Sequence, residues 1–202
     1  MATELVVHPV TPDRWDDLVM LFGERGASSG CWCMFFRLSG GEFERQAGVA
    51  AREGLRELVR DGAVPGLLAY AQGRPVGWCS VAPRQEFRRV LGSRTLRPVD
   101  HRPVWSVVCF YIDRTARRRG VAERLLDAAI QHAAAARAEA LEGYPRDTTA
   151  RPHPNAELYM GTVSMFRAAG FQEVERRSPT RPIMRLELQP GDGSDPEPPA
   201  AA

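Results

Sequence analysis

The sequence predicts one mixed α/β domain over residues 1–188, followed by a disordered Pro/Gly-rich tail at 189–202. Two observations predict this class. Segments with strand and helix periodicity alternate in the order β-α-α-β-β-β-α-β-α-β-β. One of them, residues 104–112 (VWSVVCFYI), is nearly apolar throughout, which is typical of a strand that is buried on both faces in the middle of a sheet.

The first half of the chain predicts two helices and three strands. Apolar residues at helical spacing predict helices at 12–22 and 43–60, and the aromatic block between them, residues 31–37 (CWCMFFR), has no clear period. The turn Gln72-Gly73-Arg74 is expected to close a hairpin. Strands are expected at residues 4–10, 66–71 and 75–82.

In the second half, the central strand 104–112 follows an arginine-rich stretch, 83–103, that is typical of a long loop or a short helix. Helices are expected at 120–138 and 158–169, and Gly170 is well placed to end the second one. The remaining strands are expected at residues 140–144, 171–177 and 182–188.

Composition narrows the function classes. The chain has 44% hydrophobic and 26% charged residues, a balance that is typical of a globular protein with a core. The net charge of +2 is too small to favour a nucleic-acid partner. No apolar run approaches the roughly 18 residues of a membrane span, and no secretory signal is visible at the N-terminus. We therefore expect a cytoplasmic protein with neither a nucleic acid nor a membrane as partner.

Four cysteines are the other compositional feature. Cys31 and Cys33 form a C-x-C pair, whereas Cys79 and Cys109 stand alone in strand-like runs. The histidines are scattered and supply no second close pair, so no metal site is expected. The four thiols are interpreted as reduced and mostly buried.

The loop after the central strand is a candidate anion site. The helix expected from Gly120 leaves its first N–H groups without partners and places the positive end of its dipole there. Gly120 and Ala122 are small enough for a phosphate to approach the backbone, and Arg117, Arg118 and Arg119 add positive charge. The alternative is that the three arginines only solvate the start of a helix.

These residues resemble the pyrophosphate loop of the GNAT superfamily of acyl-CoA-dependent N-acyltransferases. Arg117-x-x-Gly120-x-Ala122 after a strand is similar to the family's Gln/Arg-x-x-Gly-x-Gly/Ala pattern, although Arg118 stands where a second glycine is usual. Residues 166–174 (FRAAGFQEV) resemble the family's late helix and strand, and the order of elements agrees over residues 4–188. Five further stretches resemble uncharacterised actinobacterial members of the family: GCWCMFFR, VGWCSVAPR, RPVWSVVCFYI, EGYPRD and SPTRPIMRL.

The resemblance implies a mixed, mostly antiparallel sheet with a central splayed strand pair, flanked by about four helices. It implies acetyl-CoA as co-substrate, with its pantetheine arm in the gap between 104–112 and 140–144, paired with the backbone of residues 110–112. The positions that bind CoA in the family correspond here to residues of the strand, the loop and the late helix: Phe110, Tyr111, Ile112, Arg117, Arg118, Arg119, Gly120, Val121, Ala122, Glu123 and Phe166.

Acetyl transfer to an amine requires that the oxyanion be stabilised and that the leaving thiolate be protonated or tolerated. A strand N–H near Phe110 is expected to stabilise the oxyanion. Many family members use a tyrosine of the late helix as the acid, but Phe166 stands at that position here. Tyr159, expected two turns earlier on the same helix face, and Tyr144 are the alternative acids, with Tyr111 as a further one, and the thiolate can also leave unassisted.

Glu142 is the first candidate for the general base, and His101 and Asp113 are alternatives near the expected cleft. A covalent mechanism through Cys109 or Cys33 would need a neighbouring histidine and is the least favoured route.

The expected acceptor pocket has aromatic and arginine candidates. Trp32 and Trp78 fit a pocket wall, but they fit the core at least as well. Arg37 and Arg84 can clamp an acidic group of the acceptor or can lie on the surface, and Cys33 belongs to the same expected wall. The sequence therefore predicts an N-acetyltransferase that acts by direct attack of a small-molecule primary amine, with a homodimer as one option for its assembly. The alternative function is a non-catalytic acyl-CoA-binding or regulatory module.

Overall fold

The computed structural model describes residues 4–149 and 153–188; the tail expected at 189–202 lies outside the described residues. Seven strands in these ranges form one sheet in the order β1-β2-β3-β4-β5-β7-β6. Neighbouring strands run antiparallel, except that β4 and β5 are parallel. The predicted mixed α/β class with a mostly antiparallel sheet is therefore confirmed. The strands are β1 Leu5–Pro9, β2 Gly66–Ala71, β3 Arg74–Pro83, β4 Trp105–Ile112, β5 Ala140–Gly143, β6 Gln172–Glu175 and β7 Ile183–Glu187.

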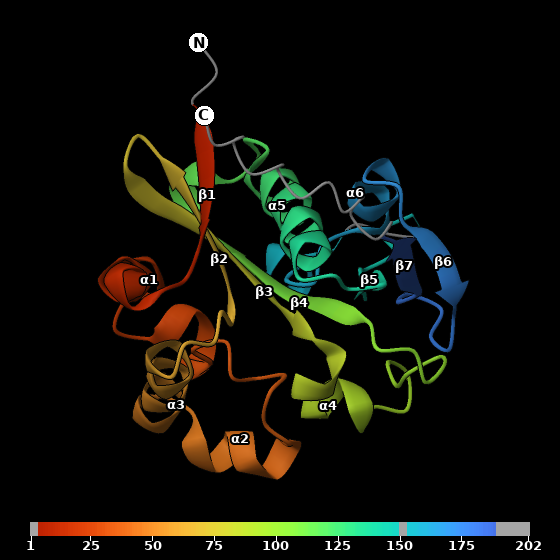
Figure 1. Cartoon of the computed structure of the whole chain (residues 1–202), viewed down its shortest axis with the longest axis horizontal. Coiled ribbons are helices and arrows are strands. Elements are labelled where there is room, and N and C mark those ends of the chain that lie inside the picture. The colour runs from red at the N-terminus through yellow and green to blue at the C-terminus, as the bar shows by residue number, and fades with distance from the viewer. Residues whose placement is uncertain (1–3, 150–152, 189–202) are drawn as a thin grey trace, which may run out of the picture.

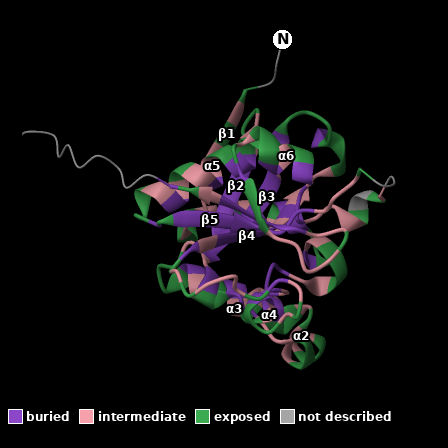
Figure 2. Cartoon of the chain, turned by 90° about the vertical axis from the view of Figure 1, so that its right-hand side faces the viewer, coloured by how far each residue is buried: buried purple, intermediate pink, exposed green. Residues whose placement is uncertain are grey.

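Helices cover both faces of this sheet, as Figures 1 and 2 show. Successive residues of a strand point to opposite faces. On one face, Cys79 of β3 packs in a core with Leu125 of α5, and on the other face Trp78 packs with Leu18 of α1 and Leu55 of α3. The α-helices in the described ranges are α1 Trp15–Phe22, α2 Gly40–Gln46, α3 Val49–Arg60, α4 Arg88–Leu91, α5 Val121–Ala135 and α6 Val163–Ala168.

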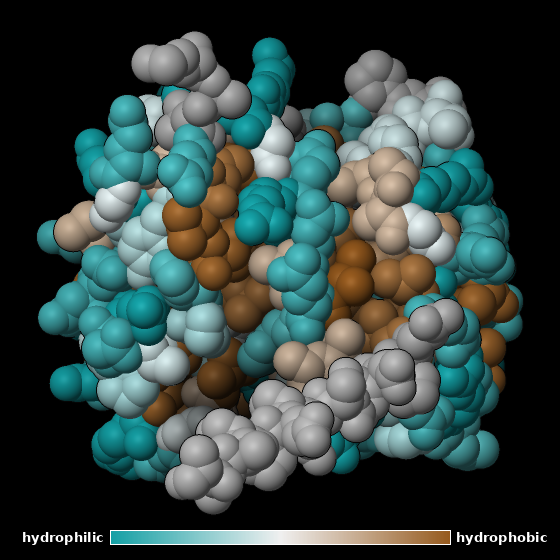
Figure 3. Space-filling model, turned by 45° about the horizontal axis from the view of Figure 1, so that its top comes forward, coloured by the Kyte–Doolittle hydropathy of each residue, from teal (hydrophilic) through white to brown (hydrophobic). Residues whose placement is uncertain are grey.

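Hydrophobic side chains are concentrated between these layers. Figure 2 shows the strands of the sheet as mostly buried and the outer faces of the helices as exposed. On the face in Figure 3, hydrophilic residues predominate and hydrophobic ones gather in recesses between them. Among the helices that the structure describes, none combines the length and the apolar character that a transmembrane span needs.

The single helix expected at 43–60 is wrong, because the chain forms α2 and α3 with a break between them. Gly48 has a φ of +91°, a conformation that only glycine adopts readily. Its N–H donates to the carbonyl oxygen of Gly30 at 2.9 Å. This contact ties the break to the loop before α2, so the helix is interrupted by a tertiary contact that periodicity does not reveal.

The helix expected at 158–169 is also wrong at its start. α6 begins at Val163, and Thr162 caps it by accepting a hydrogen bond from the backbone N–H of Met165 at 3.3 Å. Residues 158–161 are not helical. Tyr159 therefore does not lie on the same helix face as Phe166.

Candidate functional site

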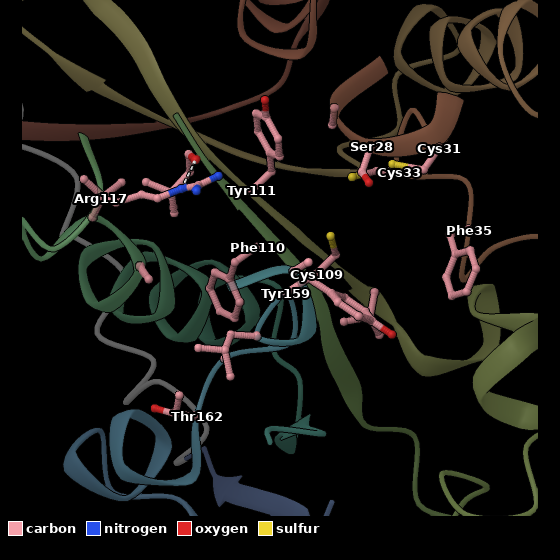
Figure 4. Close-up of a pocket in the computed structure, with 18 of the residues that line it drawn as sticks. Ser28, Cys31, Cys33, Phe35, Cys109, Phe110, Tyr111, Arg117, Tyr159 and Thr162 are labelled. Atoms are coloured by element: carbon pink, nitrogen blue, oxygen red, sulfur yellow. Dashed lines mark hydrogen bonds between the residues drawn. The ribbon is translucent and has the colours of Figure 1, made fainter. Parts of the chain in front are cut away.

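A cavity of about 810 Å³ opens beside β4, where β4 continues beyond the end of β5. Four segments and Phe43 of α2 line it: the segments are β4 from Val108 to Ile112, the loop and first turn of α5, the segment 27–36, and residues 156–165 (Figure 4). The cavity therefore joins segments from the N-terminal, central and C-terminal parts of the chain.

The gap next to β4 arises because β5 is short. β4 pairs with β5 only from Trp105 to Val107, opposite Leu141 to Gly143, and then continues beyond the end of β5 to Ile112. A side chain at Gly143 would overlap the ring of Phe166, so this ring packs directly against the end of β5. The predicted splayed strand pair is therefore present, and the cavity lies along the part of β4 that β5 does not reach.

The charged side chains that line the cavity lie at its α5 end. They are those of Arg114, Arg117, Arg118 and Glu123. The Nε of Arg117 donates to the carbonyl oxygen of Ile112 at 3.2 Å (Figure 4). The N-cap residue of α5 is Gly120, which has no side chain to cap the first turn. This end therefore combines a helix N-terminus with arginines, an arrangement that suits an anion.

Most of the residues predicted to bind CoA lie together at this cavity, and three do not. Arg119 and Gly120 belong to the same loop but are not part of the lining. Phe166 is fully buried, with its ring 6.4 Å from that of Phe110 and 4.8 Å from that of Phe171, and it does not line the cavity. The lining contains Phe110, Tyr111, Ile112, Arg117, Arg118, Val121, Ala122 and Glu123.

The backbone of β4 is less free than expected. The N–H of Phe110, predicted to stabilise an oxyanion, donates to the carbonyl oxygen of Tyr159 at 2.6 Å. The segment around Tyr159 thus occupies part of the strand edge that the resemblance leaves open for the pantetheine arm. In this conformation the Phe110 N–H is not available to a substrate.

Glu142 and Tyr144 do not border the cavity, so their expected position at the cleft is wrong. Glu142 is 1% exposed, and its carboxylate accepts hydrogen bonds from Arg84 at 3.0 Å and from Arg185 at 2.6 Å. Tyr144 is fully buried, and its hydroxyl lies 2.9 Å from Ser106 Oγ and 3.3 Å from the Glu142 carboxylate. Burial raises the pKa of Tyr144. Both side chains are held in a paired internal network.

The other candidates for proton transfer differ in position. Tyr159 lines the cavity, although it reaches it from a loop and not from a helix. Asp113 accepts hydrogen bonds from the hydroxyl and the N–H of Thr115, at 2.5 and 2.8 Å, which lower the pKa of Asp113, and it is outside the lining. His101 is exposed and is also outside the lining.

Of the predicted acceptor residues, only Cys33 borders the cavity. Trp32 and Trp78 are buried in the core on the α1 side of the sheet. Arg37 is buried and pairs with Glu86, and Arg84 pairs with Glu142. Of the two alternatives for Trp32 and Trp78, pocket wall or core, the structure shows the core. Arg37 and Arg84 are paired with carboxylates of this chain.

Three thiols gather at the other end of the cavity. Cys31, Cys33 and Cys109 all line it, the first two from the loop before α2 and the third from β4 (Figure 4). A hydrogen bond from the Cys33 thiol is the main cause that lowers the pKa of Cys31, to about 6, whereas burial raises the pKa of Cys33. Within the described ranges no group of three or more His, Cys, Asp or Glu side chains is arranged to hold a metal ion.

The loop that carries two of these thiols has an unusual backbone. Ala27, Ser29, Trp32 and Cys33 all have positive φ, between 39° and 65°, which costs free energy in residues other than glycine. The Trp32 ring of this loop packs against the rings of Trp15 and Phe22. Cys31 is absent from the site residues that the sequence predicts, and its only signal there is the C-x-C pair inside an aromatic block without a period.

Comparison with known proteins agrees with this geometry. The profile of the Acetyltransferase (GNAT) family matches residues 32–159. No curated protein sequence matches the chain significantly.

Solved structures share the fold at low sequence identity. An N-acetyltransferase from Staphylococcus aureus Mu50 is 11% identical with a TM-score of 0.53, and the match covers 93% of this chain and 100% of that one. A GNAT-family acetyltransferase from Streptococcus agalactiae is 10% identical with a TM-score of 0.54, covering 92% and 96%. A histone acetyltransferase HPA2 and related acetyltransferase from Corynebacterium glutamicum is 17% identical with a TM-score of 0.53, covering 92% and 97%. The chain belongs to the GNAT acetyltransferase family.

Proposed function

We propose that the protein transfers the acetyl group of acetyl-CoA to a primary amine of a small molecule, by direct attack of the amine on the thioester. The observation that carries this proposal is the cavity along the part of β4 that β5 does not reach. It has a positively charged helix N-terminus at one end and an aromatic, thiol-lined wall at the other. Two substrates can therefore meet in one space.

The α5 end fits the CoA part of the donor. A Cβ atom at Gly120 would meet nothing within 4 Å, so the space in front of the helix start is open. Arg117, Arg118 and the first N–H groups of α5 would hold the pyrophosphate, and Ile112 and Val121 offer apolar contacts to the arm. When bound, the co-substrate supplies an acetyl thioester.

The other end supports a small acceptor. Phe35, Phe36 and Tyr159 border it, with the rings of Phe36 and Tyr159 6.3 Å apart. Aromatic walls favour an acceptor with an apolar body, which binds by displacing water from these rings. We place the activity in the cytoplasm, since four free cysteines suit a reducing compartment.

Ligand-induced stabilisation tests the CoA site. At a hundredfold excess over Kd, acetyl-CoA should stabilise the native state by about 2.7 kcal/mol, which corresponds to a rise in Tm of about 5–10 °C. Gly120→Glu should abolish this rise, because it places a carboxylate in front of α5. Gln131→Glu adds the same charge at an exposed position further along α5 and should keep the rise. Each variant is compared with its own ligand-free Tm.

Release of free CoA in the presence of a panel of small amines tests the transfer itself. Steady release with an amine supports the acetyltransferase. A normal rise in Tm without release by any amine would instead favour the non-catalytic acyl-CoA-binding module.

A further inference from the structure

The groups that the sequence favours for the general base do not border the cavity. Glu142 is held by Arg84 and Arg185, and Asp113 and His101 lie outside the lining. The thiol cluster is a set of titratable groups that does border the cavity. A role for this cluster in proton transfer rests on the proposed acetyltransferase function.

The three thiols share one cavity wall. Cys31 and Cys33 lie on the same loop and Cys109 lies on β4, directly before Phe110, and all three line the cavity. As a neutral thiol, Cys31 donates to the carbonyl oxygen of Gly26 at 3.4 Å. Figure 4 shows the sulfur atoms of all three residues on one side of the cavity. The Cys31 thiol therefore has a hydrogen-bond acceptor of its own at the cavity wall, and the neighbouring Cys33 is the main cause that lowers the pKa of Cys31.

We propose that Cys31 is the general base of the acetyl transfer and then returns the proton as the general acid. As the N–C bond forms, the amine nitrogen becomes acidic, and the Cys31 thiolate accepts its proton directly or through one water. When the C–S bond to CoA breaks, the Cys31 thiol donates this proton to the departing sulfur. The thiolate is regenerated, so no oxidant, reductant or further reactant is needed.

The surroundings of Cys31 suit this role. Cys33 faces it from the same loop, and Tyr111 faces it from β4, where burial is the main cause that raises the pKa of Tyr111 and the Cys31 charge adds to it. From α3, the guanidinium of Arg52 lies 5.3 Å from the ring of the adjacent Trp32. Cys33 is a positioning residue, because its thiol stabilises the thiolate form of Cys31.

The test compares the wild type with Cys31→Ser, using an amine that gives steady CoA release. The variant should lose about 10²–10⁴-fold in kcat, the usual value of a positioned acid or base, and should keep the rise in Tm with acetyl-CoA. Cys79→Ala is the matched control, since Cys79 is buried on the α5 face of the sheet and outside the cavity; its kcat should stay close to wild type.

The pH profile separates a base from a structural residue. In the wild type, kcat at saturating amine should fall below a pH of about 6, because kcat reports groups of the enzyme–substrate complex and not the free amine. In Cys33→Ala the fall in activity at low pH should begin at a higher pH, because Cys31 loses the neighbour that is the main cause of its lowered pKa.

Three outcomes would overturn the role of Cys31. An unchanged kcat in Cys31→Ser, with the wild type active, overturns it and leaves the acetyltransferase standing. A protein mass increased by one acetyl group on Cys31, found after acid quench, would show a nucleophile instead of a base. Failure of the wild type to release CoA with any amine overturns the proposed function, and the role of Cys31 with it.

Discussion

Two clusters of titratable side chains flank β4, and they differ in how their polar atoms are used. Next to the end of β4 that pairs with β5, Glu142 is enclosed by Arg84, Arg185 and Tyr144. Further along β4, past the residues that pair with β5, the thiols of Cys31, Cys33 and Cys109 border the cavity. A group whose partners are all internal stabilises one structure, whereas a group at a cavity wall can exchange a proton with a ligand.

The Glu142 cluster illustrates the cost of burying charge. Two guanidinium groups and a carboxylate lose their hydration, and their mutual attraction compensates only while each keeps its partners. Arg185 also pairs with Asp100 at 2.7 Å, and Arg84 donates to the carbonyl oxygen of Arg102 at 2.8 Å. The cluster therefore links β5, β7 and the loop before β4.

The largest expected effect is a loss of stability when the Glu142 cluster is broken. Glu142→Gln leaves Arg84 and Arg185 buried without their shared anion, and should lower the free energy of unfolding by about 3–5 kcal/mol in urea denaturation. Glu139→Gln, at an exposed partner of Arg102, should change it by less than about 1 kcal/mol. Unchanged stability together with a large loss of kcat would make Glu142 a catalytic candidate again.

The second effect concerns the thiols. Because the pKa of Cys31 is lowered to about 6, its thiolate is lost only as the pH falls below that value. Alkylation of Cys31 by iodoacetamide should therefore change by less than about twofold between pH 6.5 and 8.5, whereas an unperturbed thiol speeds up about 50-fold. Peptide mass spectrometry measures the rate at each pH. A steep rise through pH 8 would contradict the lowered pKa.

The smallest effect is expected at Tyr144. Tyr144→Phe removes the hydrogen bonds to Ser106 and Glu142 and should cost about 1 kcal/mol of stability. Since Tyr144 does not border the cavity, kcat and its high-pH limb should stay as in the wild type. A loss of kcat well beyond the change in stability would restore Tyr144 as the acid.

Part of the site could be predicted from local sequence. The arginine-rich loop before α5 is recognisable because a strand, a glycine and a helix start are consecutive in the chain. Tyr159 does line the cavity, but the helix expected to carry it begins only at Val163. The resemblance places Phe166 at the CoA site, whereas close packing against Gly143 puts it in the core.

The sequence by itself determined the class of the fold, the order of the strands along the chain and the predicted CoA loop, because hydrophobic periodicity and helix-start chemistry are properties of neighbouring residues. Only the tertiary structure decided which polar groups are paired and which border the cavity. Arg84, Glu142 and Arg185 lie far apart in the chain, as do Cys31 and Cys109, and only folding brings them together. The availability of a side chain for chemistry depends on the partners and the burial that it acquires there, and neither is encoded in its own segment.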